Sequence, residues 1–252
     1  PVPRTALGLV DDAVVVVRAR AALLVPLGLA GYGGVAVALL IAGTVGGDGS
    51  LHAVVAALHR RNELAGRTLG LIPLGTGNDF ARTLDIPLDP EAAARVILKG
   101  VVRRVDLLAD ELGGIVVNNV HIGASAQASR KGATWKKRLG KFGIGIIGYP
   151  IGAAIAAVKP PFIRLHVEID DEVVADMDRH ILMLAIGNGA SVGGGTEVTP
   201  DAEPHDGEAD VMISYATGPV DRFAYALRLR RGEHHRRDDV AYLHGRTISV
   251  SG

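Results

Sequence analysis

Two glycine-rich turns carry the residues best suited to chemistry in this sequence. The first runs from Gly46 to Ser50 and reads Gly-Gly-Asp-Gly-Ser, and the second runs from Pro73 to Phe80 and reads Pro-Leu-Gly-Thr-Gly-Asn-Asp-Phe. Because glycine has no Cβ, the backbone N–H groups of such turns can approach phosphate oxygens closely. Each turn adds a hydroxyl and a carboxylate, Asp48 or Asp79, that can organise Mg²⁺ or a substrate hydroxyl. We therefore expect the two turns to face each other across a pocket and to hold one nucleotide triphosphate.

The same two turns resemble the motifs of the diacylglycerol kinase catalytic domain family, which includes bacterial lipid kinases, diacylglycerol kinases and sphingosine kinases. Ser50 stands where the family usually has Thr, and it keeps the hydroxyl. Phe80-Ala81-Arg82 continues the second turn in the family's manner, whereas NAD kinases and phosphofructokinases share only the first kind of turn. The resemblance implies an ATP- and Mg²⁺-dependent lipid kinase that phosphorylates a hydroxyl of a diacylglycerol-like lipid.

The resemblance also implies roles for particular residues. Asp48, Asp79 and Asp106 would arrange metal and substrate, although Asp106 is equally explained as a solvated carboxylate at a strand end. The residues that would contact ATP lie in the first turn, in the start of the next helix and at one hydroxyl of the second turn: Gly46, Gly47, Asp48, Gly49, Ser50, Leu51, His52 and Thr76.

A third segment resembles the family's structural metal site. A Gly-Asn-Gly sequence at 187–189 and a glycine triplet at 193–195 lead to Asp206, which would bind a second Mg²⁺ together with the backbone carbonyls of Glu203 and Glu208. One carboxylate, carbonyls and waters suit this hard cation, and a polar turn between two strands is the alternative. The family's general base belongs to an Asp-Gly-Glu turn expected just after residue 252. We therefore assign no base within this chain.

The elements around the two turns alternate between strands and helices. Ser50 can cap a helix over Leu51–Arg61, and Thr68–Ile72 reads as a strand that enters the second turn. Asp89-Pro90 opens a helix that ends at Lys99 before Gly100. This alternation predicts an α/β nucleotide-binding domain over residues 1–106. The family resemblance implies that the fold of this domain is similar to that of NAD kinase and phosphofructokinase.

Strands dominate the rest of the chain. Asp170-Asp171 reads as the turn of a hairpin between two of them. The expected strands are Ile115–Val120, Phe162–Ile169, Glu172–Met177, His180–Ile186, Ala209–Ser214 and Thr247–Val250. They predict a second, mostly antiparallel domain over residues 107–252, which the resemblance places on the lipid side.

Composition limits the cellular setting and the partners. The chain has 252 residues with a formal net charge of zero, so its overall charge does not favour binding to nucleic acid. The absence of cysteine excludes disulfides and fits a reducing compartment. Residues 21–47 carry no charge, which we interpret as buried strands and a glycine-rich crossover rather than a membrane anchor. We expect a cytoplasmic protein at the inner face of the membrane, and a homodimer stays open.

Two basic clusters favour contact with an anionic membrane, although a solvated charged face explains them as well. The first cluster contains Arg130, Lys131, Lys136, Lys137, Arg138 and Lys141 around Trp135; the second contains Arg228, Arg230, Arg231, His234, His235, Arg236 and Arg237. Two other functions stay open: a kinase for a soluble substrate, similar to NAD kinase, and a nucleotide-binding module without catalysis.

Overall fold

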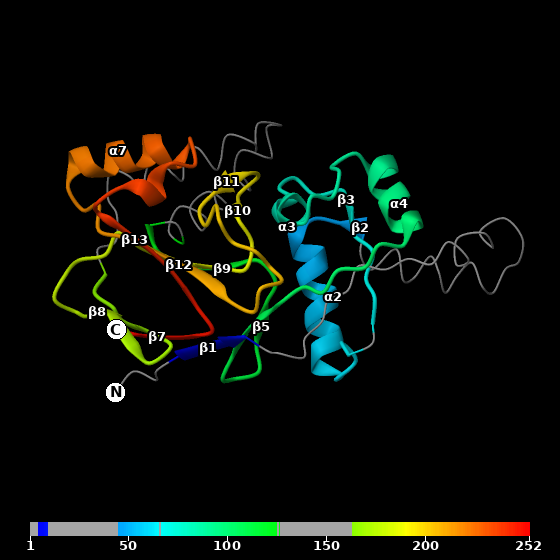
Figure 1. Ribbon diagram of the computed structural model, residues 1–252, viewed down its shortest axis with the longest axis horizontal. Coiled ribbons are helices and arrows are strands. Elements are labelled where there is room, and N and C mark those ends of the chain that lie inside the picture. Colours follow the sequence, from blue (N-terminus) through cyan, green and yellow to red (C-terminus); the bar gives the residue numbers. More distant parts are fainter. Residues whose placement is uncertain (1–4, 10–44, 66, 125, 127–162) are drawn as a thin grey trace, which may run out of the picture. The chain divides into compact units, whose positions relative to one another are not determined.

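The computed structural model describes residues 5–9, 45–65, 67–124, 126 and 163–252 (Figure 1). They form two compact units, and each is described by itself. Unit 1 contains residues 120–186 and 210–252 with the first six residues, and unit 2 contains residues 7–119 and 187–209. The uncharged run at 21–47 lies almost wholly outside the described residues, and the first basic cluster lies entirely outside them.

Unit 2 brings the two glycine-rich turns to one edge of a small parallel sheet. Strand β2 (Val45–Gly46) leads into helix α2 (Asp48–Arg60), and strand β3 (Ile72–Pro73) leads through the second turn into helix α3 (Asp79–Thr83) (Figure 1). The two strands pair in parallel, with Val45 opposite Ile72. Parallel neighbours end at the same edge, so both turns emerge side by side. The predicted strand over 68–72 keeps only its last residue in β3.

The core of unit 2 lies behind these turns. Helix α2 buries Leu51 and Val55, and α3 contributes Phe80, which is only 1% exposed. Helix α4 (Pro90–Lys99) has the predicted bounds. Its first turn is capped by the Asp89 carboxylate, which accepts a hydrogen bond from the Ala92 amide at 2.8 Å, and Gly100 ends it in a left-handed conformation.

Further strands complete the sheets of the two units. In unit 2, residues 7–9 of β1 (Thr5–Leu9) pair with β4 (Leu108–Asp110), and β4 pairs with β5 (Ile115–Val116). In the same unit, β10 (Ser191–Val192) pairs with β11 (Thr196–Glu197). In unit 1, a four-stranded sheet has the order β13 (Val240–Gly245), β12 (Ala209–Ser214), β9 (Met183–Gly187) and β6 (Asn119–Gly123).

Unit 1 also contains an antiparallel ladder and two short helical elements. Strand β7 (His166–Ile169) pairs with β8 (Glu172–Ala175) and with β14 (Thr247–Ser251). Asp170 and Asp171 join β7 to β8 with φ of 48° and 69°, which confirms the predicted hairpin. Helix α7 (Pro219–Leu229) and the 3₁₀ turn η4 (His234–Arg236) precede β13 (Figure 1).

The predicted order of an α/β domain followed by a β-rich domain is confirmed, but the structure divides the chain differently from the expected boundary at 106/107. Unit 2 continues to Asn119 and then regains residues 187–209. This return depends on hydrogen bonds between residues about a hundred positions apart, such as that from the Gly194 amide to Asp79. No local sequence pattern predicts a hydrogen bond between residues this far apart.

Candidate functional site

The two glycine-rich turns are in direct backbone contact. A Cβ added at Gly47 would lie 2.9 Å from the Cα of Gly75, and the Leu74 amide donates to the Gly46 carbonyl at 3.0 Å. The crevice beneath the turns has no room for a water molecule. The expectation of a pocket between the turns was therefore wrong: they form one continuous backbone surface, which only glycine at both positions allows.

The amino-terminal end of α2 is open to an anion. Its N-cap residue is Gly47, whose carbonyl accepts hydrogen bonds from the Ser50 and Leu51 amides, and no side chain caps the helix. Among the described residues, the amides of Asp48 and Gly49 have no acceptor. Such unpaired amides, together with the helix dipole, favour a phosphate at this point.

The side chains around this helix end divide into exposed and buried ones. Gly49, Ser50 and His52 are exposed, and nothing lies within 4 Å of a Cβ added at Gly49. Leu51 is 3% exposed and packs in the core, so only its backbone can face a nucleotide. Thr76 is exposed on the second turn. The predicted ATP contacts remain a prediction, and the exposed residues at this helix end leave the surface accessible to a ligand.

Asp48 holds the second turn to the first. One carboxylate oxygen accepts a hydrogen bond from the Asp79 amide at 3.1 Å, and the other accepts one from the Phe80 amide at 2.9 Å. These two amides begin α3, so Asp48 caps that helix across a gap of more than thirty residues in the sequence. The carboxylate thereby fixes the relative position of both turns.

Asn78 closes the second turn from within. It is buried and left-handed, with φ of 54°, a conformation that asparagine tolerates better than most residues. Its side-chain oxygen accepts from the Gly75 amide at 2.8 Å, and its side-chain nitrogen donates to the Gly75 carbonyl at 2.9 Å. The turn is therefore rigid before any ligand binds, which lowers the entropy cost of binding.

Asp79 is buried and clamps the glycine triplet of the returning segment. Its carboxylate accepts hydrogen bonds from the Gly194 amide at 2.9 Å, the Gly195 amide at 2.7 Å and the Ser191 hydroxyl at 3.2 Å. A carboxylate buried in this way is stable because backbone donors compensate for lost water. This bond set is what draws residues 187–209 into unit 2.

The two carboxylates lie on the same side of the second turn. A Cβ added at Gly77 would lie 2.9 Å from Asp79 Oδ2 and 3.2 Å from Asp48 Oδ2. Because both groups already accept backbone hydrogen bonds, a directly bound metal would have to compete with those amides. Their predicted role with metal and substrate stays a prediction, and the structure adds an architectural role for each.

Three more polar side chains take part in holding residues 187–209 in unit 2. Thr83 Oγ1 accepts a hydrogen bond from the Ala190 amide at 3.0 Å, and the Ser191 hydroxyl reaches Asp79. Asn118 donates to the Ser191 carbonyl at 3.0 Å. Thr83 and Ser191 carry no motif of their own, so only their proximity in space reveals them.

Asp106 lies beside the proposed structural metal segment. Its carboxylate accepts a hydrogen bond from the Gly207 amide at 2.9 Å, and its own amide donates to the Pro204 carbonyl at 2.9 Å. Buried Asn188 donates to the Asp106 carbonyl at 2.8 Å. Asp106 thus acts on the turn that bears Asp206, while its predicted role with metal and substrate stays a prediction.

The oxygen atoms available at the turn around Asp206 are of the kind that bind Mg²⁺. Asp206 is exposed, and Oδ1 accepts a hydrogen bond from the Glu208 amide, which leaves Oδ2 without a partner among the described residues. The Glu203 carbonyl accepts from the His205 amide at 2.8 Å and keeps a second lone pair. Within the described residues, no three acidic or histidine side chains converge, so any cation here would depend on carbonyls and water.

Comparison with known proteins places these features in a family. The model of the diacylglycerol kinase catalytic domain matches residues 36–109, and that of the YegS C-terminal NAD kinase beta sandwich-like domain matches residues 118–252, which is more than half of the chain. The chain belongs to the family of the YegS C-terminal domain, and the part before it matches the diacylglycerol kinase catalytic domain. The Asp48–Asp79 clamp joins the catalytic-domain match to residues 194 and 195 of the second match.

Individual relatives agree with this assignment. A Pseudomonas aeruginosa protein named "Probable lipid kinase YegS-like" is 36% identical over 70% of this chain and 54% of its own length. A Staphylococcus saprophyticus diacylglycerol kinase is 30% identical over 82% of this chain and 64% of its own. The chain thus spans between about half and two thirds of these relatives.

Solved structures support the fold. A crystal structure described as a diacylglycerol kinase from Bacillus anthracis strain Sterne has a TM-score of 0.58 at 20% identity, covering 82% of this chain and 63% of that one. A further structure from that strain reaches a TM-score of 0.64 at 23% identity, covering 82% of this chain and 65% of that one.

Within the described part of this chain, every helix is too short or too polar to cross a bilayer.

Proposed function

We propose that this chain is the ATP-binding and lipid-binding portion of a lipid kinase that transfers the γ-phosphoryl group of ATP to a hydroxyl of a diacylglycerol-like lipid. The observation that carries the proposal is the open end of α2, where the amides of Asp48 and Gly49 have no acceptor among the described residues. Family membership supplies the reaction class, and the triphosphate would lie against these amides with Ser50 and Thr76 as hydroxyl donors.

Rigid positioning is the main contribution that such a site can make. Phosphoryl transfer depends on holding the phosphates in line and neutralising charge, with little covalent chemistry from the protein. The backbone contact between Gly47 and Gly75 and the Asp48 clamp on α3 fix both turns in advance. Mg²⁺ would supply charge neutralisation at the phosphates, and Asp206 with neighbouring carbonyls would hold a second, structural ion.

A substrate comparison tests this proposal. The full-length protein that contains this chain is incubated with radiolabelled ATP, Mg²⁺ and either vesicles that contain diacylglycerol or NAD in solution, and ATP binding is measured separately by calorimetry. Label in the lipid supports the proposal. Label in NAD instead, or ATP binding with no transfer to any lipid tested, contradicts it and favours a soluble-substrate kinase or a non-catalytic module.

A further inference from the structure

The outward face of helix α7 in unit 1 is apolar, which reverses the usual pattern of a surface helix. Val220, Phe223 and Leu227 are spaced at i, i+3 and i+7, so they form one stripe along the helix. Val220 is 79% exposed, Phe223 is 74% exposed and Leu227 is 43% exposed. The buried residue of this helix is Tyr225, at 4% exposure, which lies on the opposite side.

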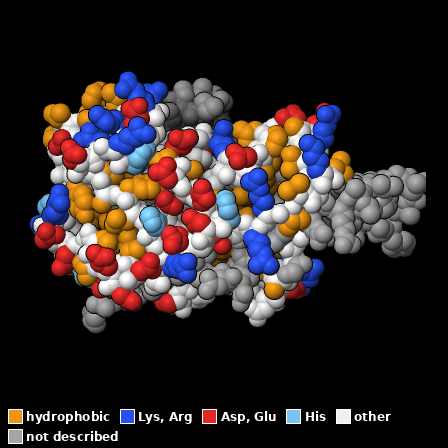
Figure 2. Space-filling view, viewed as in Figure 1, with side chains coloured by type: hydrophobic (Ala, Val, Ile, Leu, Met, Phe, Trp, Pro, Cys, Tyr) orange, Lys and Arg blue, Asp and Glu red, His pale blue; other side chains and the backbone are white. Residues whose placement is uncertain are grey.

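Positive charge surrounds this stripe. Between Pro219 and Asp239 the sequence has six arginines against four acidic residues. Arg228, Arg230, Arg231 and Arg236 are all exposed, and none of the four has an ion pair among the described residues. Figure 2 shows Lys and Arg side chains gathered over the region of α7 and η4, beside hydrophobic side chains.

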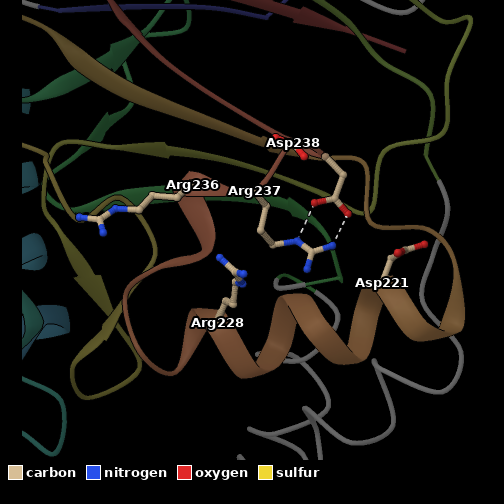
Figure 3. A pocket seen from close by; sticks show the side chains of 6 residues that line it. Asp221, Arg228, Arg236, Arg237 and Asp238 are labelled. Carbon is tan, nitrogen blue, oxygen red and sulfur yellow. Dashed lines mark hydrogen bonds and ion pairs between the residues drawn. The ribbon is translucent and has the colours of Figure 1, made fainter.

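The pocket next to α7 is a less suitable ligand site than the stripe. It has a volume of about 350 Å³ and is lined by three arginines and three aspartates, so its charges balance. Arg237 donates two hydrogen bonds of 2.6 Å to Asp239. In Figure 3, Arg228 rises from α7 towards Arg237, whereas Arg236 extends away. Arg230 and Arg231 are exposed and do not line this pocket, so their charges remain for an external partner.

We propose that the stripe of Val220, Phe223 and Leu227, with the arginines at the carboxyl end of α7, docks unit 1 onto a bilayer that contains anionic lipids. A helix that presents bulky apolar side chains beside arginines matches the interface of such a bilayer, where the side chains enter the acyl boundary and the cations meet the headgroups. The proposal rests on the proposed function, since a lipid kinase must reach a substrate that lies in a membrane.

Site-specific fluorescence can test this surface directly. The chain has no cysteine, so Phe223→Cys can carry a single environment-sensitive dye. Leu112→Cys is the matched control, because Leu112 is an apolar residue at 87% exposure in unit 2. We expect the dye at position 223 to shift to the blue on phosphatidylcholine vesicles that contain phosphatidylglycerol, and the dye at position 112 to stay unchanged.

Vesicle flotation of unlabelled protein separates the apolar and the charged contributions. Phe223→Ser should lower the partition coefficient about tenfold, and Arg230→Glu with Arg231→Glu should do the same only on anionic vesicles. Arg103→Glu with Arg104→Glu, an exposed pair in unit 2, is the control for an equal change of charge.

Three results would overturn the proposal: equal blue shifts at positions 223 and 112, equal partitioning of the wild type and Phe223→Ser, or a shift at 223 that depends on protein concentration without vesicles. The last would show that a second copy of the chain covers the stripe. These measurements use no nucleotide. If these vesicle measurements fail, the kinase proposal is therefore unaffected. If no phosphoryl transfer is found, a measured docking to vesicles still holds.

Discussion

Substitution of Asp79 by asparagine isolates the bonds that hold residues 187–209 in unit 2. The carboxylate accepts hydrogen bonds from the amides of Gly194 and Gly195 and from the Ser191 hydroxyl. An asparagine keeps one oxygen, but its NH₂ group cannot accept from an amide, and the charge is lost. Charged acceptors are worth more than neutral ones by about 1 kcal/mol each, and an unpaired buried donor adds about 1 kcal/mol or more. We expect Asp79→Asn to weaken this attachment by about 2–3 kcal/mol.

Hydrogen–deuterium exchange measures this attachment without assuming that the two units unfold together. A local loss of about 2–3 kcal/mol corresponds to roughly 30- to 150-fold faster exchange of the Gly194 and Gly195 amides. Asp89→Asn is the control, because it makes the same chemical change at the cap of α4, where asparagine caps a helix equally well. Unchanged exchange at residues 194 and 195 in Asp79→Asn would refute the clamp.

Two further substitutions test the packing of the turns and the acid sensitivity of unit 1. Gly75→Ala should lower the free energy of unfolding of unit 2 by about 1–3 kcal/mol, because its Cβ would overlap Gly47; urea unfolding that matches the wild type would contradict this. The pKa of His121 is lowered to about 4 by burial, and both of its ring nitrogens lack partners among the described residues. Since the folded pKa lies below the unfolded value of about 6.5, stability is present above that pH and is lost as the pH falls towards 4. His121→Phe should therefore lose about 2 kcal/mol less than the wild type between about pH 7.5 and pH 5, and parallel losses in urea titrations would count against this origin.

Local signals in the sequence were enough to predict several elements. Pro90 and Gly100 fix the two ends of α4 because proline favours the first helical position and glycine favours the left-handed end. Asp170 and Asp171 both adopt positive φ, as a two-residue hairpin requires. The glycine-rich patterns around residues 47 and 75 marked a place of close backbone contact, because a Cβ at either position would overlap the other turn.

Other features depend on contacts that no local pattern encodes. Asp79 and Gly194 are 115 residues apart, so the sequence could not show that this carboxylate holds a turn of another segment. The same reason hid the capping of α3 by Asp48. Helix α7 was not predicted, because its arginines were interpreted as a membrane contact or a solvated charged face, although Gly218-Pro219 followed by Asp221 is a helix start signal. Strand β13 lacks a clear alternation of buried and exposed residues.

Titration calorimetry of ATP binding to the wild type and to Gly49→Ala tests the central claim, that the amides at the start of α2 hold the triphosphate. Nothing lies within 4 Å of a Cβ at this position, and alanine in a helix is more stable than glycine by up to about 1 kcal/mol. The variant should therefore be at least as stable as the wild type. Its methyl group would stand where the phosphate must approach, so we expect ATP affinity to fall about tenfold, or about 1.4 kcal/mol. Equal affinity for ATP in a folded Gly49→Ala would contradict the site.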